Sequence, residues 1–171
     1  MEYRKIEPAA INGNPFSLIG GEWALVTAQK NDGTVNTMTI SWGSMGVLWG
    51  KNVVQVYLRP QRYTKEFVDE AGRFTLSFYG PDAKKELGYL GKVSGRDEDK
   101  IAKIGFTVKE FNGVPAFDGA RLVFVCRSLY TQTVDPACFL PGTSCDADWY
   151  PQKDYHTQYV AEIEAVYEKV E

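Results

Sequence analysis

The chain has 171 residues, of which 44% are hydrophobic and 24% are charged, and its net charge is −3. A chain of this length buries roughly 70% of its unfolded surface, so one domain over residues 1–171 is expected to fold without a disulfide or a structural metal. The 19 Lys and Arg residues are scattered among 22 Asp and Glu residues. This distribution argues against a nucleic-acid binder, because such proteins cluster their cations.

From the N-terminal segment, the hydropathy and the cysteines we expect a cytoplasmic protein without a signal peptide or a membrane span. Residues 1–21 lack the apolar core of a signal peptide, and no window approaches the roughly 18 apolar residues of a membrane span. The three cysteines, Cys126, Cys138 and Cys145, have no CxxC spacing, and the chain contains one histidine. We therefore expect free thiols in a reducing compartment and no metal site.

Taken in chain order, the sequence predicts around seven strands. The segments are rich in β-branched and aromatic residues, and several alternate polar with apolar positions. They are Trp23–Gln29, Thr34–Trp42, Asn52–Leu58, Arg73–Tyr79, the pair 106–111 and 114–117, Ala120–Val134, and 156–170. Asn31-Asp32-Gly33 and Asn112-Gly113 are typical hairpin turns between consecutive strands.

Three short helices are predicted between these strands, at Lys65–Ala71, about Asp82–Leu87, and Asp97–Ile104. Gly72 follows the first of them as a C-terminal cap. Strands joined by hairpins and short helices predict a mainly β fold, a closed antiparallel barrel with short crossing helices. Closure of the barrel would remove exposed strand edges.

The turn RPQRYT, Arg59 to Thr64, separates the third strand from the first helix and is a candidate anion site. A helix N-terminus offers unpaired N–H groups and a partial positive charge. Arg59 and Arg62 lie three residues apart around Pro60, so both could converge on one phosphate. The alternative is a solvated pair of arginines beside an ordinary helix cap.

The strand NTMTISWG, Asn36 to Gly43, places Thr37, Thr39 and Ser41 on one face. Three hydroxyls on one face suit either a solvent edge or a polar ligand that lies along the strand. Gly43 and Gly46 would allow the backbone to approach a flat ring closely. The alternative is a plain amphipathic strand.

Two further segments allow a structural and a functional interpretation. GKVSGRDEDK, Gly91 to Lys100, is either a polar loop before a helix or a mobile loop that brings Lys92, Arg96 or Lys100 to a bound anion. His156 opens the last strand and has no nucleophile or carboxylate at a diagnostic spacing. No GxGxxG or GxxxxGK[ST] nucleotide motif occurs in the chain.

Taken together, NTMTISWG, LRPQRYT, FTLSFYG, GKVSGRDEDK and YHTQYVAEI resemble, in this order, the flavin reductase-like family of the FMN-binding split barrel, which includes flavoredoxin-type proteins. The resemblance covers about Trp23 to Tyr167. It implies a split β-barrel, a homodimer, and an FMN site at the interface between the two protomers.

The resemblance also implies roles for individual residues. The ring and ribityl chain would lie along Thr37, Met38, Thr39, Ser41, Trp42 and Gly43. The phosphate would be held by Arg59, Arg62, Tyr63 and Thr64. Ser77 stands where the family often has an Asn near the flavin, and His156 matches a histidine near flavin and nicotinamide. We expect Lys92 or Arg96 to place positive charge near N1 of the ring.

These expectations lead to two functional hypotheses and one competing interpretation. The first is an oxidoreductase that passes electrons or hydride between NAD(P)H, or a redox partner, and flavin. The second is a non-enzymatic electron-transfer flavoprotein of the flavoredoxin type. The competing interpretation is a β-barrel module that binds another phosphorylated ligand and has no affinity for FMN.

Overall fold

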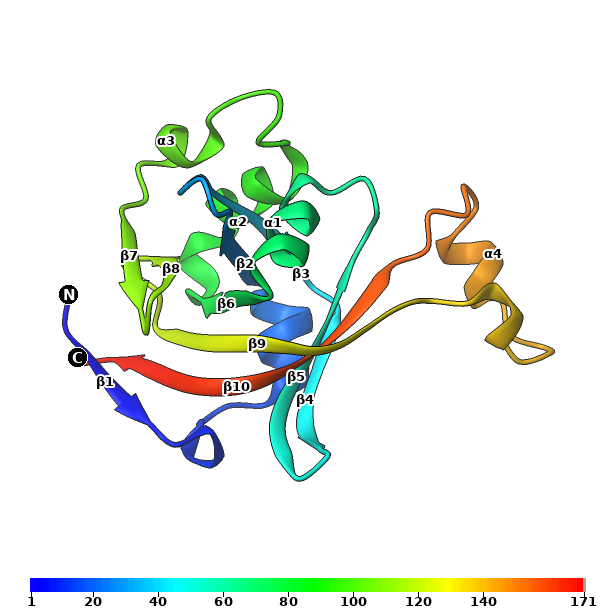
Figure 1. Ribbon diagram of the computed structural model, residues 1–171, viewed down its shortest axis with the longest axis horizontal. Coiled ribbons are helices and arrows are strands. Elements are labelled where there is room, and N and C mark those ends of the chain that lie inside the picture. Colours follow the sequence, from blue (N-terminus) through cyan, green and yellow to red (C-terminus); the bar gives the residue numbers. More distant parts are fainter. Residues whose placement is uncertain (171) are drawn as a thin grey trace.

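A computed structural model describes residues 1–170 and has a mainly β architecture with four short α-helices (Figure 1). The strands are β1 (Tyr3–Ile6), β2 (Ala24–Gln29), β3 (Val35–Ile40), β4 (Gly43–Leu48), β5 (Lys51–Leu58), β6 (Arg73–Phe78), β7 (Val108–Phe111), β8 (Val114–Phe117), β9 (Leu122–Thr133) and β10 (Thr157–Lys169). The α-helices are α1 (Tyr63–Ala71), α2 (Lys84–Lys92), α3 (Lys100–Ile104) and α4 (Cys145–Trp149). Short 3₁₀ or π segments lie at Pro8–Ala10, Ser17–Glu22, Pro81–Ala83 and Pro136–Cys138.

The main sheet is antiparallel and runs in the order β3-β2-β6-β9-β10-β5-β4, with β1 added along β10. The mainly β, antiparallel prediction is therefore confirmed. Closure is not confirmed, because the strands of residues 1–170 show no pairing between the two edge strands β3 and β4. Only Ser41 and Trp42 separate these edges in sequence. The sheet thus has a seam at the point where these two residues connect β3 to β4.

The inner face of the sheet forms the main hydrophobic core. Side chains at alternate strand positions meet there, including Val26, Phe74, Phe78 and Phe124, none of them more than 1% exposed. Helix α1 contributes Phe67 to the same cluster. Burial of this apolar surface is the main favourable contribution to folding, at roughly 25 cal/mol per Å².

The outer face of the same sheet is also covered, by α2 and the β7–β8 hairpin. Leu25 of β2 packs with Leu87 and Leu90 of α2 and with Phe117 of β8. The Thr75 hydroxyl donates to the carbonyl of Pro115 at 2.7 Å. The threonine hydroxyls of Thr27, Thr37 and Thr75 on this face are therefore buried and hydrogen-bonded within the protein, whereas the buried hydroxyl of Ser77 has no partner among residues 1–170.

Strands β9 and β10 lie side by side and continue beyond the rest of the sheet into a projecting segment that contains α4 (Figure 1). This segment, residues 134–156, returns to the sheet next to the end of β5. There the Arg59 guanidinium donates to the carbonyl of Trp149 at 3.0 Å and pairs with Asp154. The ion pair ties the returning chain to the β5–α1 turn.

Several elements differ from the sequence prediction. Strand β4, GSMGVL, was not predicted because two glycines interrupt its alternation, although it pairs with β5 over its length. Strand β1 and helix α4 were also missed. Helix α2 starts later than predicted and continues to Lys92, and α3 begins at Lys100 rather than Asp97 because Asp99 caps it by accepting from Ala102 N. Within residues 1–170, no helix is long and apolar enough to cross a membrane.

Replacement of Phe124 by Ala should lower the free energy of unfolding by about 3–5 kcal/mol, because it leaves a cavity in the inner core. Phe124 is fully buried, and its ring centroid lies 5.4 Å from that of Phe78. Urea unfolding followed by circular dichroism measures the change. Phe16→Ala is the control: Phe16 is 87% exposed, and its replacement should change stability by no more than about 0.5 kcal/mol. Equal losses in both variants would contradict this account of the core.

Candidate functional site

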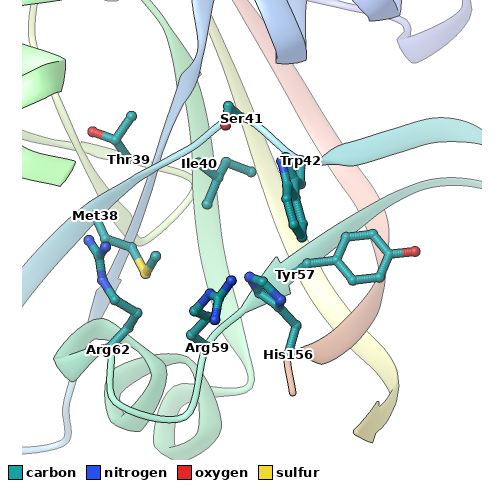
Figure 2. A pocket seen from close by; sticks show the side chains of 9 residues that line it. All are labelled: Met38, Thr39, Ile40, Ser41, Trp42, Tyr57, Arg59, Arg62 and His156. Carbon is teal, nitrogen blue, oxygen red and sulfur yellow. The ribbon is translucent and has the colours of Figure 1, made fainter. Parts of the chain in front are cut away.

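Two neighbouring cavities of about 180 Å³ each lie at the seam of the sheet and at the start of α1. The first, here called the seam cavity, is drawn in Figure 2 and is lined by Met38, Thr39, Ile40, Ser41, Trp42, Tyr57, Arg59, Arg62 and His156. The second, the helix cavity, is lined by Gln61, Arg62, Tyr63, Thr64, Lys92, Val93, Ser94, Gly95 and Lys100. Arg62 lines both, so the two cavities adjoin at its side chain.

The start of α1 faces the helix cavity. Arg62 has extended backbone angles and precedes the helix, and no side chain caps this end. The first turn of a helix leaves its N–H groups without intrahelical acceptors, so the amides of Tyr63 and Thr64 are available to a ligand. Thr64 is 1% exposed, and its hydroxyl has no hydrogen-bond partner among residues 1–170. The helix dipole adds a partial positive charge at this position.

Arg62 is a partly buried cation without an acidic partner. None of the ion pairs formed within residues 1–170 includes its guanidinium. Burial lowers the pKa of Arg62, which means that its charge is poorly solvated. An unpaired charge in such a position is unfavourable for folding, and an anionic ligand would compensate for that cost.

Lys100 is a second, more deeply buried cation in the helix cavity. It is 3% exposed, and its ammonium donates to the carbonyls of Leu90 at 3.1 Å and Val93 at 2.9 Å. Burial, assisted by the charge of Arg62, lowers the pKa of Lys100 to about 8. An ammonium has three hydrogens, so one donor remains for a ligand. Lys100 and Arg62 repel each other, which makes an anion between them favourable.

The loop between α2 and α3 forms one wall of the helix cavity. Gly95 lies so close to the buried side chain of Asn36 that an added Cβ would come 2.7 Å from its Oδ1. Arg96 holds the loop against α1, since it pairs with Glu66, donates to the carbonyl of Gln61 at 3.2 Å, and stacks 4.4 Å from the centre of the Tyr63 ring. Arg96 therefore positions the wall and does not line the cavity.

Arg59 lies in the seam cavity and not beside the N-terminus of α1. Its guanidinium pairs with Asp154, which also accepts from Gln61 Nε2 at 2.9 Å. The prediction that Arg59 and Arg62 converge on one phosphate is thus not supported by their positions. Arg59 is already paired and anchors the returning chain, whereas Arg62 extends toward the helix cavity beside Met38 (Figure 2).

His156 lies next to Arg59 and beneath the Trp42 ring (Figure 2), with 4.9 Å between the Trp42 and His156 ring centroids. The imidazole is 7% exposed, and its Nδ1 is 2.9 Å from the hydroxyl of Tyr150. Burial, together with the charge of Arg59, lowers the pKa of His156 to about 4. The imidazole is therefore neutral at physiological pH, which suits a hydrogen-bonding group in a cavity that already holds two arginines.

The cavities bring together most of the residues predicted from the sequence. Those that line one or both are Met38, Thr39, Ser41, Trp42, Arg59, Arg62, Tyr63, Thr64, Lys92 and His156. Thr39 contributes less side chain than predicted, because its hydroxyl donates to the carbonyl of Leu87 at 2.6 Å. Its position at the outer edge of β3 still leaves backbone groups available, since β3 pairs only with β2.

Thr37, Gly43 and Ser77, like Arg96, line neither cavity. Thr37 is fully buried on the outer face. Its hydroxyl donates to the carbonyl of Val26 at 3.0 Å and lies 2.9 Å from the hydroxyl of Thr27. Ser77 is fully buried on the same face. The prediction of one exposed hydroxyl face is wrong for Thr37, because α2 and the β7–β8 hairpin cover that face.

Gly43 has a different reason for being glycine than the one inferred from the sequence. A Cβ at this position would lie 2.6 Å from the carbonyl oxygen of Gln55 in the neighbouring strand. The close approach is therefore between β4 and β5, not between the backbone and a ligand. Gly46 has no atom within 4 Å of an added Cβ.

Sequence reasoning did not assign seven of the residues that line the cavities: Ile40, Tyr57, Gln61, Val93, Ser94, Gly95 and Lys100. Ile40 and Tyr57 lie within predicted strands, and Gln61 lies within the predicted turn. Candidate residues next to them in the sequence therefore indicated their positions. Lys100 was considered only as one cation of a loop. Its burial follows from the packing of α3 against α2, which local sequence does not reveal.

The family model for the flavin reductase like domain matches residues 16–171. The chain belongs to the flavin reductase-like family. Its fold is similar to an FMN-binding domain of a flavin reductases-like enzyme from Shewanella baltica OS155, at a TM-score of 0.69 and 18% identity over 98% of this chain and 77% of that one. No curated protein matches the chain in sequence.

Two further solved structures share its fold. Flavoredoxin from Methanosarcina acetivorans matches at a TM-score of 0.66 and 24% identity, over 96% of this chain and 76% of that one. The styrene monooxygenase flavin reductase from Pseudomonas putida S12 matches at a TM-score of 0.62 and 22% identity, over 85% of this chain and 78% of that one. At these identities the similarity establishes only the fold of this flavin reductase-like chain. Its activity has to be inferred from the residues of the site.

Replacement of Gly95 by Ala should displace the wall of the helix cavity and lower the free energy of unfolding by about 1–3 kcal/mol, because the buried Asn36 has little room to move. Thermal unfolding measures the loss. Gly88→Ala is the matched control: Gly88 lies inside α2 with no atom within 4 Å of an added Cβ, so the change should be neutral or slightly stabilising. If both variants melted like the parent protein, the close contact between Gly95 and Asn36 would be refuted.

Proposed function

We propose that this flavin reductase-like chain binds FMN, with the phosphate in the helix cavity and the flavin ring in the seam cavity. The observation that supports this most strongly is a pair of cations without acidic partners, the partly buried Arg62 and the buried Lys100, at an uncapped helix N-terminus. A phosphate dianion would accept from both side chains, from the Thr64 hydroxyl and from the free amides of the first turn.

The residues present fit such a ligand. FMN has an anionic end and a flat aromatic end, and the two cavities differ in the same way: cations and amides line one, while Met38, Ile40 and Trp42 give the other an apolar wall. The unpaired edge of β3 offers peptide N–H and carbonyl groups for the polar rim of the ring. Arg62, which lines both cavities, would fix the ligand at the point where phosphate and ribityl chain meet.

When bound, FMN supplies hydride or electron acceptance at N5. This chain would supply orientation and electrostatics. Trp42 packs against His156 and would limit the access of water to one side of the seam cavity. Arg62 would stabilise negative charge that develops on the ring. We place this role on Arg62 because Arg59 is paired with Asp154 and Arg96 with Glu66, while Lys92 is an exposed residue at the rim of the helix cavity.

We infer further that the chain is an oxidoreductase that passes hydride or electrons between NAD(P)H, or a redox partner, and flavin. Ser41 is exposed and Trp42 is half-buried at the mouth of the seam cavity, which leaves room for a second reactant on the same side as His156. A non-enzymatic electron-transfer flavoprotein is the other possibility. The homodimer and the cytoplasmic location remain predictions from the sequence.

Replacement of Lys100 by Met should weaken FMN binding by about 10- to 150-fold at pH 7, the equivalent of one charge-assisted hydrogen bond of 1.5–3 kcal/mol. Affinity for FMN in the parent protein should also fall as pH rises through about 8, because Lys100 loses its proton there while the phosphate stays a dianion. The variant should lack that fall. Quenching of flavin fluorescence between pH 7 and 9 measures both effects.

Lys103→Met is the control for this experiment, because Lys103 lies on the same helix with a side chain that is 62% exposed. It should bind FMN like the parent at every pH. An affinity that is independent of pH and insensitive to Lys100→Met would argue against a phosphate beside Lys100.

Rapid mixing of the FMN-loaded protein with NADH and with NADPH under anaerobic conditions distinguishes the two functional classes. If the chain is a nicotinamide-dependent reductase, flavin absorbance should bleach within seconds with at least one of the two. Bleaching by dithionite but by neither nucleotide would instead support the electron-transfer protein. The dithionite reaction also serves as the control that the bound flavin is reducible.

A further inference from the structure

Tyr150 and His156 form a buried hydrogen-bonded pair at one wall of the seam cavity. The Tyr150 hydroxyl lies 2.9 Å from His156 Nδ1, and the two residues are 6% and 7% exposed. Tyr150 ends α4 and His156 precedes β10, so the pair spans the projecting segment where it returns to the sheet. His156 is the only histidine of the chain.

The surroundings decide which partner donates the proton. Burial raises the pKa of Tyr150, so the phenol keeps its hydrogen at neutral pH. Among residues 1–170 the phenol has no hydrogen-bond partner other than Nδ1, so Nδ1 is the acceptor available for its hydrogen. Because the imidazole is neutral, it has one N–H. When Nδ1 accepts from Tyr150, that hydrogen must be on Nε2.

The second ring nitrogen is open to the cavity. Nε2 forms no hydrogen bond within residues 1–170. It is also absent from the side-chain atoms that are both unpartnered and buried, so Nε2 is exposed enough to reach a ligand. The ring itself lines the seam cavity beneath Trp42 (Figure 2). An accessible N–H in the wall of a cavity is a directional hydrogen-bond donor.

We propose that Tyr150 is a positioning residue that holds His156 in the Nε2–H tautomer, so that His156 presents an uncharged N–H donor to a carbonyl oxygen or ring nitrogen of the molecule in the seam cavity. This assigns a role to a residue outside the cavity. It rests on the proposed function only for the identity of that molecule, because the tautomer is a property of the chain itself.

A neutral donor suits this position for an electrostatic reason. The charged and titratable groups that face His156 or line its cavity are Arg59 and Tyr57 of the β5 segment, Arg62 of the β5–α1 turn, Asp154 of the returning loop, and Tyr150. Arg59 is already neutralised by Asp154. An imidazolium would add an unpaired charge beside that ion pair, whereas a neutral ring adds direction at no such cost.

Nitrogen NMR of the full-length protein tests the proposal, because its single imidazole gives one unambiguous set of signals. Two-bond ¹H–¹⁵N correlation spectra of ¹⁵N-labelled protein distinguish a protonated from an unprotonated ring nitrogen. We expect the Nε2–H tautomer alone, unchanged from pH 8 down to about 5. A predominant Nδ1–H tautomer, or an equal mixture, would overturn the proposal without the use of any variant.

Tyr150→Phe removes the phenol donor and keeps the ring. In this variant the two tautomers should become mixed. The pKa of His156 should rise because the donor that favours the neutral ring is lost, but it should stay below the ordinary value of about 6.5, since burial and the charge of Arg59 remain. Tyr155→Phe is the matched control, since the Tyr155 ring packs 4.8 Å from that of Tyr150 but its hydroxyl donates to Asp146 at 2.8 Å. An identical tautomer and pKa in Tyr150→Phe and the parent would refute the positioning role.

Addition of ligands to the parent protein tests the donor itself. FMN, and then NADH to the FMN-loaded protein, should shift the His156 Nε2–H signal in at least one step. If both bind and neither shifts it, the donor role is wrong. Failure of FMN to bind would be detected separately by flavin fluorescence and would refute the proposed function, while the tautomer result would stand on its own.

Discussion

Two cations without an acidic partner, the buried Lys100 and the partly buried Arg62, determine the character of this protein. Arg62 and Lys100 meet at the uncapped start of α1, and the surroundings lower the pKa of both. Other arginines of the same region are neutralised: Arg59 by Asp154 and Arg96 by Glu66. Folding therefore leaves an unfavourable concentration of positive charge at one place, and such a place is best explained as the binding site of an anion.

The sheet topology places this anion site next to an apolar cavity. Because β3 and β4 are edge strands joined only by Ser41 and Trp42, the sheet leaves a seam, and the ends of β5 and β10 open beside it. The same turn that ends β5 begins α1. A ligand with a phosphate and a flat ring could thus contact the helix N-terminus and the seam at once, as the proposed binding of FMN requires.

Much of this site could be predicted from the sequence, because its residues lie in short continuous segments. The turn from Arg59 to Thr64 and the strand from Met38 to Trp42 have local patterns that identify a helix start and an edge strand. What could not be predicted depends on contacts between distant segments. Arg59 appears equivalent to Arg62 in sequence, and only the return of the chain at Asp154 distinguishes the two.

The fold shows the same division. Strands with clear alternation were predicted within a few residues, whereas β4 was missed because pairing with β5, and not its own composition, makes it a strand. The alternation of Thr37, Thr39 and Ser41 was identified correctly, but the face was assigned to solvent or ligand. A polar face can equally be buried when neighbouring threonines and carbonyls satisfy its hydroxyls, as Thr27 and Val26 do for Thr37.

The most direct test of the account compares FMN with riboflavin, which has the same ring and no phosphate. The parent protein should bind FMN at least about 100-fold more tightly, since two cations would each contribute a charge-assisted hydrogen bond. In a double variant, Arg62→Met with Lys100→Met, this preference should fall to within a few-fold of unity. Equal affinity of the parent for both compounds, or an undiminished preference in the double variant, would contradict the assignment of these cations to the phosphate.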